Sequence, residues 1–259
     1  MAMKNERAWA NLIHLSYNMW TDRVPKERPD GGPWKQHAPN VHIRHYPNKP
    51  YLRLNQPLWD AILKRMADQG LNMVVIDVGD GVRYESHPEI AVKGAWSVEK
   101  LRGELKKMHA MGLEPIPKLN FSACHDAWLG PYARMVSTPT YYKVVKDLLA
   151  EVIRIFDKPR YFHIGMDEET FSHQRYFRYA LIRQYDLWWH DFLFYVKEIE
   201  KKGTRAWIWS DYVWEHPDEF RKKMPKSVVQ SNWYYNEEFE EADFAAYAKR
   251  TGSEESAKR

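Results

Sequence analysis

Strand-like and helix-like segments alternate six times along the chain, and this alternation restricts the fold more than any other feature. The second strand-like segment, residues 71–80, is an almost continuous apolar run, which is typical of a parallel strand buried on both faces. The strand-like segments span residues 12–20, 71–80, 114–121, 161–166, 205–211 and 228–235, and the helix-like segments span 58–69, 97–112, 138–156, 177–202, 217–224 and 238–250. This order indicates an α/β protein with a parallel sheet and right-handed crossovers.

Polar residues recur where the predicted strands end. The set comprises Asp77, Asp80, Asn120, Asp167, Glu168, Asp211 and Asn232. Because the strand ends of a barrel converge on one pocket, this regularity favours a TIM-type (β/α)8-like barrel over an open sheet. The chain shows about six β/α units, so two open sheet edges must be covered. A hairpin within residues 41–54 or a second copy of the chain, in a homo-oligomer, would close the barrel.

The length allows one large domain or two small ones, and the repeated strand–helix order predicts a single barrel domain over residues 1–259. Within it, the polar, Pro-rich stretch 21–56 is a long loop insertion, and residues 251–259 form a frayed tail. No apolar run reaches the ~18–20 residues that a membrane helix needs. Residues 1–7 are polar, so no signal peptide is expected at this start, and the compartment stays open.

Composition and charge exclude further classes of protein. The net charge of +4 is spread along the chain without a basic block, which argues against nucleic-acid binding. One cysteine, Cys124, excludes an internal disulfide and a multi-cysteine metal site. The aromatic share is 15%, with 12 Trp and 16 Tyr, which fits either a large core or stacking platforms for sugars.

Residues 161–169 run from an aromatic strand directly into Asp167, Glu168 and Glu169. Adjacent carboxylates repel one another, which tends to raise at least one pKa toward the range of a general acid. The alternative is a solvated first turn of the next helix, where acids favour the helix dipole. On spacing alone both interpretations stay open.

Several motifs resemble the β-N-acetylhexosaminidases, the family-20 glycoside hydrolases. Residues 163–168 read His-Ile-Gly-Met-Asp-Glu and resemble the family signature His-x-Gly-Gly-Asp-Glu. The matches in chain order are Ser86-His87-Pro88-Glu89 and Gly94-Ala95-Trp96-Ser97 between strands two and three, Pro117 to His125 at strand three, Trp207 and Trp209 at strand five, and Trp233 at strand six. The resemblance covers roughly residues 12–235.

The resemblance implies a (β/α)8 barrel that cleaves glycosidic bonds with the substrate's own acetamido group as nucleophile. It implies that Glu168 is the general acid/base and that Asp167 orients the acetamido group. Neighbouring strand residues point to opposite faces, so the strand must end or bend at Asp167 if both are to reach one pocket. The implied substrate is a carbohydrate, with no cofactor. The candidate substrate-binding residues are His125, His163, Trp209, Trp233, Asp211, Asn120, Asp80 and Tyr235.

The chain departs from the family pattern at several positions. The arginine that ends strand one in the family has no counterpart, and the Glu and Asp of the strand-three motif are Lys118 and Asn120. Met166 replaces a glycine of the signature. The tyrosine of strand seven and the tryptophan of strand eight have no counterparts either. The acid/base pair is therefore expected to persist while the sugar specificity changes.

Other sites were weighed against this one. His125 and His163 could bind a metal with Asp77, Asp126 or Asp211, but their spacing matches no compact ligand motif, so no metal is predicted. Cys124 beside His125 is interpreted as packing rather than as a nucleophile. Only one of Trp207 and Trp209 is expected to line the pocket. Besides the glycosidase, a non-catalytic carbohydrate-binding or incomplete barrel that needs a partner chain remains the alternative.

Overall fold

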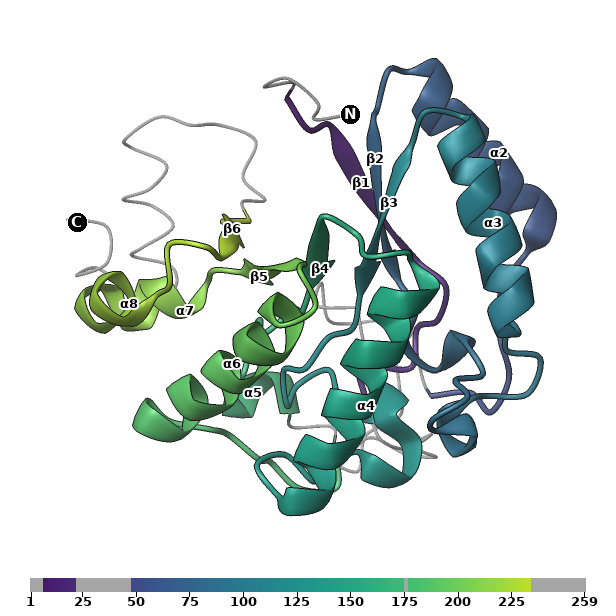
Figure 1. Cartoon of the computed structure of the whole chain (residues 1–259). Helices are drawn as coiled ribbons and strands as arrows, with labels where there is room; N and C mark the ends of the chain where they lie inside the picture. Colours follow the sequence, from purple (N-terminus) through teal and green to yellow (C-terminus); the bar gives the residue numbers. More distant parts are fainter. Residues whose placement is uncertain (1–6, 22–47, 175–176, 234–259) are drawn as a thin grey trace, which may run out of the picture.

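The computed structural model describes residues 7–21, 48–174 and 177–233. Six parallel strands form one curled sheet in which every strand lies beside its neighbours in sequence (Figure 1). In order they are β1 (Ala10–His14), β2 (Met73–Asp77), β3 (Glu114–Lys118), β4 (Tyr161–His163), β5 (Arg205–Trp209) and β6 (Val229–Ser231). The six predicted strands of a TIM-type barrel are therefore confirmed, as a half-barrel, with helices in the connections from β1 to β6.

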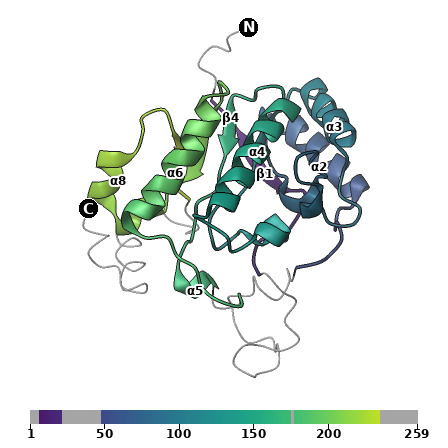
Figure 2. The same cartoon turned by 60° about the horizontal axis from the view of Figure 1, so that its bottom comes forward.

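Helices follow the strands and lie along one side of the sheet (Figures 1 and 2). They are α2 (Gln56–Asp68), α3 (Val98–Ala110), α4 (Pro139–Ile155), α5 (Phe171–Gln174), α6 (Tyr185–Glu200), α7 (Tyr212–Glu215) and α8 (Pro217–Lys223), with 3-10 turns η1 (Gly79–Gly81), η2 (Pro88–Ile90) and η3 (Ala127–Tyr132). None of the helices in the described ranges is both long enough and apolar enough to span a bilayer.

Local sequence signals fix the starts of the crossover helices. The Ser97 hydroxyl accepts a hydrogen bond from the backbone N–H of Lys100 at 3.1 Å and begins α3, as predicted. Thr138 caps α4 in the same way through the N–H of Tyr141 at 3.2 Å. Each cap satisfies one of the N–H groups that a first helical turn leaves unpaired.

The fourth crossover differs from its prediction. A continuous helix over 177–202 was expected, but α6 begins only at Tyr185. Side chains from earlier in the same crossover bind the preceding backbone instead: Gln174 Oε1 accepts the N–H of Leu181 at 2.7 Å, and Glu169 Oε1 accepts the N–H of Arg183 at 2.8 Å. These hydrogen bonds between side chains and backbone override the aromatic, helix-like pattern of this segment.

Most predicted strands also extend beyond the observed ones, since β1 ends at His14 and β6 at Ser231. The first half of the predicted hairpin within 41–54, residues 41–47, lies outside the described residues, and the helix over 238–250, the tail over 251–259 and Tyr235 lie entirely outside them.

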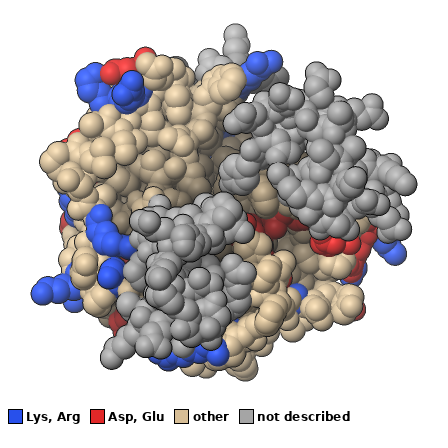
Figure 3. All heavy atoms as spheres, turned by 180° about the vertical axis from the view of Figure 1, so that it is seen from behind, with Lys and Arg blue, Asp and Glu red and all other residues tan. Residues whose placement is uncertain are grey.

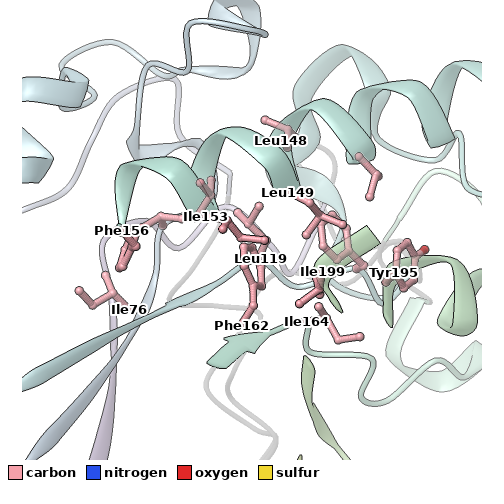
Figure 4. Close-up of a cluster of buried hydrophobic side chains, with 14 of the residues drawn as sticks. Ile76, Leu119, Leu148, Leu149, Ile153, Phe156, Phe162, Ile164, Tyr195 and Ile199 are labelled. Carbon is pink, nitrogen blue, oxygen red and sulfur yellow. The ribbon is translucent and has the colours of Figure 1, made fainter. Parts of the chain in front are cut away.

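The main core lies between the sheet and the helices. Figure 4 shows Leu149 and Ile153 of α4 directed toward Leu119 and Phe162 at the ends of β3 and β4. These four side chains, and Leu148 on the same helix, are at most 2% exposed. Burying each of them contributes roughly 1.5–3 kcal/mol, so α4 holds the central strands firmly in place.

The other face of the sheet carries a smaller apolar layer of Met73, Val75 and Ile116, with Leu12, Tyr161 and Trp207 packed against it. Two residues further along each strand, at its carboxyl end, this face becomes polar. His14, Asp77, Lys118 and His163 lie in direct register on β1 to β4. This cross-strand polar row forms the floor beneath the loops that follow the strands. Seen from behind, acidic side chains lie at the surface between the regions drawn in grey (Figure 3).

Candidate active site

The backbone turns sharply after β4. The strand ends at His163, and positive φ angles follow at Gly165 (68°), Met166 (75°) and Glu168 (58°). Positive φ is unusual for residues with a side chain and removes the alternation of a regular strand. Asp167 and Glu168 therefore approach the same group from consecutive positions, and the predicted bend is confirmed.

Asn120 shapes this turn. Its Oδ1 accepts the N–H of Met166 at 3.2 Å and of Ser122 at 3.0 Å, and its Nδ2 donates to Asp167 Oδ1 at 2.8 Å. The amide lies so close to Gly165 that a Cβ there would overlap it. Glycine at 165 thus allows the loop after β3 to position the first carboxylate.

His125 lies between the two carboxylates. Its Nε2 is 3.4 Å from Asp167 Oδ2 and 3.3 Å from Glu168 Oε2. The imidazole is 1% exposed, and Trp20 packs edge-on against it with ring centroids 4.7 Å apart. Burial would lower the pKa of His125, but the charges of Asp167 and Glu168 outweigh burial and raise the pKa to about 10. His125 therefore carries a positive charge at neutral pH.

The two carboxylates have different surroundings. Burial would raise the pKa of Asp167, but the charge of His125, assisted by Lys118 and Asn120, holds that pKa well below its usual value. Asp167 is therefore ionised. The Glu168 side chain is 24% exposed against 16% for Asp167. Glu168 is thus the acid that a bound molecule would reach more easily.

Asp211, directly after β5, supports Glu168 from the other side. Its Oδ2 accepts the backbone N–H of Glu168 at 2.9 Å. Burial and the charge of Asp167 raise the pKa of Asp211 to about 6, against hydrogen bonds from Glu168 and Trp233. The structure thus brings Asp211 and Trp233 to the segment that carries Asp167 and Glu168.

The third acid of the run, Glu169, belongs to the core. Its carboxylate accepts hydrogen bonds from Nε of Arg183 at 2.9 Å, Nη2 of Arg183 at 2.5 Å and the N–H of Ala123 at 2.9 Å. Arg183 is 2% exposed and also donates to the carbonyl oxygen of Phe121 at 2.7 Å. This clamp ties together the loops after β3 and β4, and no sequence motif identified it.

Cys124 is buried, and its thiol donates a hydrogen bond to the carbonyl oxygen of Glu168. Burial raises the pKa of the thiol well above its usual value, so it does not form a thiolate near neutral pH. The side chain packs under the turn, in agreement with the prediction that it is no nucleophile.

The polar row beneath the site contains a buried ion pair of Lys118 and Asp77, which are 2% and 1% exposed. Burial would raise the pKa of Asp77, but Lys118 and His14 hold it at about 2. Burial and the charge of Lys118 lower the pKa of His163 to about 3, so its imidazole is neutral. His163 Nδ1 accepts the N–H of Gly165 at 3.0 Å, which links the floor to the turn.

Trp207 and Trp209 both pack against His163, with ring centroids 5.1 and 4.6 Å away. Both side chains lie on the same face of β5, because residues two apart on a strand share a face. The expectation that only one of them lines the pocket stays a prediction. Ala206, before Trp207, and Ile208, between the two tryptophans, are buried in the core under the helices.

Asp80 is engaged by residues that follow β1. It accepts hydrogen bonds from the Ser16 hydroxyl and from Asn18 Nδ2, the latter at 2.7 Å. Burial raises its pKa to about 6, although these hydrogen bonds favour the ionised form.

The metal ligands suggested by the sequence, His125 and His163 with one of three aspartates, do not come together as a set. Asp126, for example, is paired with Arg134 at 3.0 Å. Instead, single ligand atoms of His125, Asp167 and Glu168 lie within 4.8 Å of one another.

Known proteins with similar folds include family-20 enzymes. An exo-β-N-acetylglucosaminidase from Vibrio harveyi matches with a TM-score of 0.55 and 17% identity, covering 78% of this chain and 38% of the other. A β-N-acetylhexosaminidase from Bacteroides fragilis matches with a TM-score of 0.56 and 15% identity, covering 79% and 44%. A β-hexosaminidase from Streptomyces plicatus matches with a TM-score of 0.55 and 14% identity, covering 78% and 44%.

In sequence, the chain is similar to a lacto-N-biosidase from Bifidobacterium bifidum, with 22% identity over 207 residues. The match covers 68% of this chain and 18% of that protein. No protein-family profile matches the chain. The chain thus spans less than half the length of each of these relatives. In its fold, the chain is similar to the family-20 glycoside hydrolases and contains, in its described residues, six parallel strands of their type of barrel with the helices that connect them.

Proposed function

We propose that this chain carries the acid/base centre of a glycoside hydrolase that acts on an N-acetylhexosaminide or a related sugar. One observation carries the proposal: Asp167 and Glu168, consecutive in sequence, both approach His125 at the carboxyl end of β4. A regular strand would direct them to opposite faces. The positive φ angles after β4 are backbone strain of the kind that accompanies functional sites.

In this proposal Glu168 is the general acid/base. Its partly exposed side chain would donate a proton to the leaving oxygen and later accept one from water. Asp211 fixes the backbone of Glu168, and His125 contacts its Oε2 at 3.3 Å. The carboxyl group is thus held in place while one edge remains accessible to a sugar.

Asp167 would act as the ionised partner in a retaining, substrate-assisted reaction. The acetamido oxygen of the substrate attacks the anomeric carbon, the bond to the leaving oxygen breaks, and positive charge develops on the resulting ring. A carboxylate that stays charged stabilises that ring and accepts a hydrogen bond from its N–H. Asn120 and His125 keep Asp167 both ionised and oriented.

The surroundings of the pair favour a change of sugar. Lys118, in place of the glutamate of the family motif, is bound to Asp77 and buried, so it is not free to bind a hydroxyl group. Asp80 is likewise engaged by Ser16 and Asn18. Substrate contacts are therefore expected from the side of Asp211 and Trp233.

The test is hydrolysis of aryl glycosides with and without a 2-acetamido group, by the wild type and by the Glu168→Gln and Asp167→Asn variants. We expect turnover of the acetamido sugars, with kcat reduced by about 10²–10⁴ in Glu168→Gln. The loss should be larger for phenols that are poor leaving groups, because these need the acid most. Asp167→Asn should reduce kcat for all leaving groups. Glu85→Gln, at a 61% exposed carboxylate paired with Arg154, serves as the control.

The outcomes separate the function classes. Turnover only of sugars without the acetamido group would retain the hydrolase and reject the substrate-assisted reaction. Sugar binding without turnover by the folded wild type would reject the enzyme and favour the alternative of a non-catalytic or incomplete barrel. Equal turnover by the wild type and Glu168→Gln would reject the assignment of the acid.

A further inference from the structure

We propose that His125, Asp167 and Glu168 form a binding site for a divalent transition-metal ion, with Zn²⁺ as the best match. The three residues come from two loops, after β3 and after β4, and their ligand atoms lie within 4.8 Å of one another. Their sequence spacing gives no ligand motif, so the site exists only through the fold. The binding step is independent of the proposed glycosidase activity.

The distances agree with a tetrahedral ion better than with direct hydrogen bonds. Charge-assisted N–H···O bonds are about 2.7–2.9 Å long, whereas His125 Nε2 lies 3.4 and 3.3 Å from the two carboxylate oxygens. With Zn–N and Zn–O bonds of about 2.0–2.2 Å, neighbouring ligand atoms of a tetrahedron are roughly 3.3–3.6 Å apart. The observed separations fall in that range.

The environment of His125 Nε2 is a second observation in favour of a metal ion. His125 is 1% exposed, yet its Nε2 makes no hydrogen bond of normal geometry to any residue in the described part of the chain. Buried polar atoms nearly always have a partner, so such an atom directed at two carboxylates indicates a ligand between them. Trp20, edge-on to the ring, fixes the direction of Nε2.

Asp167 and Glu168 each direct one carboxylate oxygen toward the proposed ion. Asn120 Nδ2 holds Oδ1 of Asp167 at 2.8 Å and leaves Oδ2 toward His125. His173 Nε2 lies 3.5 Å from Oε1 of Glu168, whose Oε2 is directed toward His125. Outer groups that orient the ligands in this way are a regular feature of metal sites. The partly exposed Glu168 leaves a fourth position open to water, as in zinc sites with three protein ligands.

Charge also favours a dication. Zn²⁺ bound by a neutral imidazole balances the charges of two carboxylate ligands. Its presence would withdraw the oxygens of Glu168 from proton transfer, so Zn²⁺ should inhibit the proposed hydrolysis. Only this last consequence rests on the proposed function.

The chain offers a matched control in His87. It also lies near two carboxylates, with Nδ1 3.1 Å from Glu89 Oε1 and Nε2 3.3 Å from Asp147 Oδ2. These contacts use different ring nitrogens, so the two carboxylates lie on opposite sides of the imidazole. The residue types and distances match those at His125, but no single ion can join all three groups.

The experiment is titration of the metal-free full-length chain with Zn²⁺ by calorimetry, and with Co²⁺ by visible absorption. We expect one ion per chain, intense tetrahedral Co²⁺ bands, and an affinity weakened more than about 100-fold by His125→Gln or Asp167→Asn, beyond the usual effect of an outer-shell change. His87→Gln should bind as the wild type does. Should His125→Gln fail to fold, Glu168→Gln, at a partly exposed ligand, replaces it.

No binding by the folded wild type, or equal binding by the His125→Gln and His87→Gln variants, would overturn the site. Inhibition by Zn²⁺ that a chelator reverses would support the consequence for catalysis, and activation by Zn²⁺ would overturn it. Zn²⁺ binding without any hydrolysis would reject the proposed function and leave the metal site intact. Hydrolysis without Zn²⁺ binding would reject the metal site and leave the proposed function intact.

Discussion

The contact between Gly165 and Asn120 controls the site at the scale of single residues. Asn120 holds Asp167 through Nδ2 and the backbone of the turn through Oδ1. It can do both only because position 165 has no side chain. Glycine also adopts the φ of 68° without strain. One missing methyl group therefore determines where the first carboxylate lies.

Replacing Gly165 with Ala should displace Asn120 and reduce both stability and activity. We expect a loss of about 2–4 kcal/mol in the free energy of unfolding, since steric overlap adds to backbone strain. Gly203→Ala is the matched control, because its φ is also positive, at 80°, and nothing lies within 4 Å of the new Cβ. That variant should lose only about 1 kcal/mol. Urea unfolding of both proteins measures the difference, and equal losses would contradict the role of the Asn120 contact.

Asp80 gives a prediction about pH. Burial raises its folded-state pKa to about 6, above the unfolded value of about 3.9. Its contribution to stability is therefore complete below pH ~4 and is lost as the pH rises through about 6. Relative to Asp80→Asn, the wild type should gain about 1–3 kcal/mol of unfolding free energy between pH 7.5 and 4.5. Urea titrations at several pH values test this, and a difference that stays constant with pH would refute it.

At the scale of elements, the cross-strand row of His14, Asp77, Lys118 and His163 joins four strands beneath the site. Its centre is the buried pair of Lys118 and Asp77. Charges in this position are stable only as a pair, because either one alone would be desolvated without compensation. The row therefore couples the stability of the sheet to the electrostatics of the site.

Lys118→Met should destabilise the fold by about 3–5 kcal/mol, because Asp77 is left buried and unpaired. Adding Asp77→Leu to this variant should recover much of the loss. The exposed pair of Lys64 and Asp68, with side chains 71% and 56% accessible, provides the control: Lys64→Met should change stability by less than about 1 kcal/mol. Chemical denaturation of the single and double variants tests this, and a double variant as unstable as Lys118→Met would contradict the pairing argument.

The order of the elements could be predicted from the sequence, because apolar periodicity and capping residues such as Ser97 and Thr138 act locally. The strand ends near Asp77 and Asp211 were predictable for the same reason. The late start of α6 was not, because the side chains of Glu169 and Gln174, which lie earlier in the same crossover, bind the backbone of the segment before it.

The candidate site was predictable only in part. The motif identified Asp167 and Glu168, but positive φ at Met166 and Glu168 is a product of the loops packed around them. The role of Glu169 depends on Arg183, 14 residues away and folded back onto it. The pairing of Lys118 with Asp77 likewise depends on strand register. Such contacts are long-range, so no local pattern specifies them.

At the scale of the whole molecule, the sheet is an open half-barrel with β1 and β6 at its edges. Among the described residues, each of these strands pairs on one side only. All five residues of β2 are buried, whereas β6 has none that is fully buried. Cooperative stability should therefore decrease from the central strands toward β6.

Hydrogen exchange followed by mass spectrometry tests this gradient. Amides of β2 and β3 should exchange most slowly, and those of β6 should exchange fastest among the strands, because its outer edge has no strand partner in the described part of the chain. The slow peptides should include Val74 to Ile76. Protection of β6 equal to that of β2 would show instead that another strand covers its edge.

Each of the three acids after β4 occupies a different environment, and none of them can take the position of its neighbour. Asp167 is held against His125, Glu168 opens toward the surface, and Glu169 is buried against Arg183. Deleting one residue between Gly165 and Asp167 would leave the composition of the run unchanged but move each acid into its neighbour's environment. Arg183 would then no longer contact Glu169. Insertions and deletions in this segment should therefore be far more damaging than conservative substitutions at any one of the three acids.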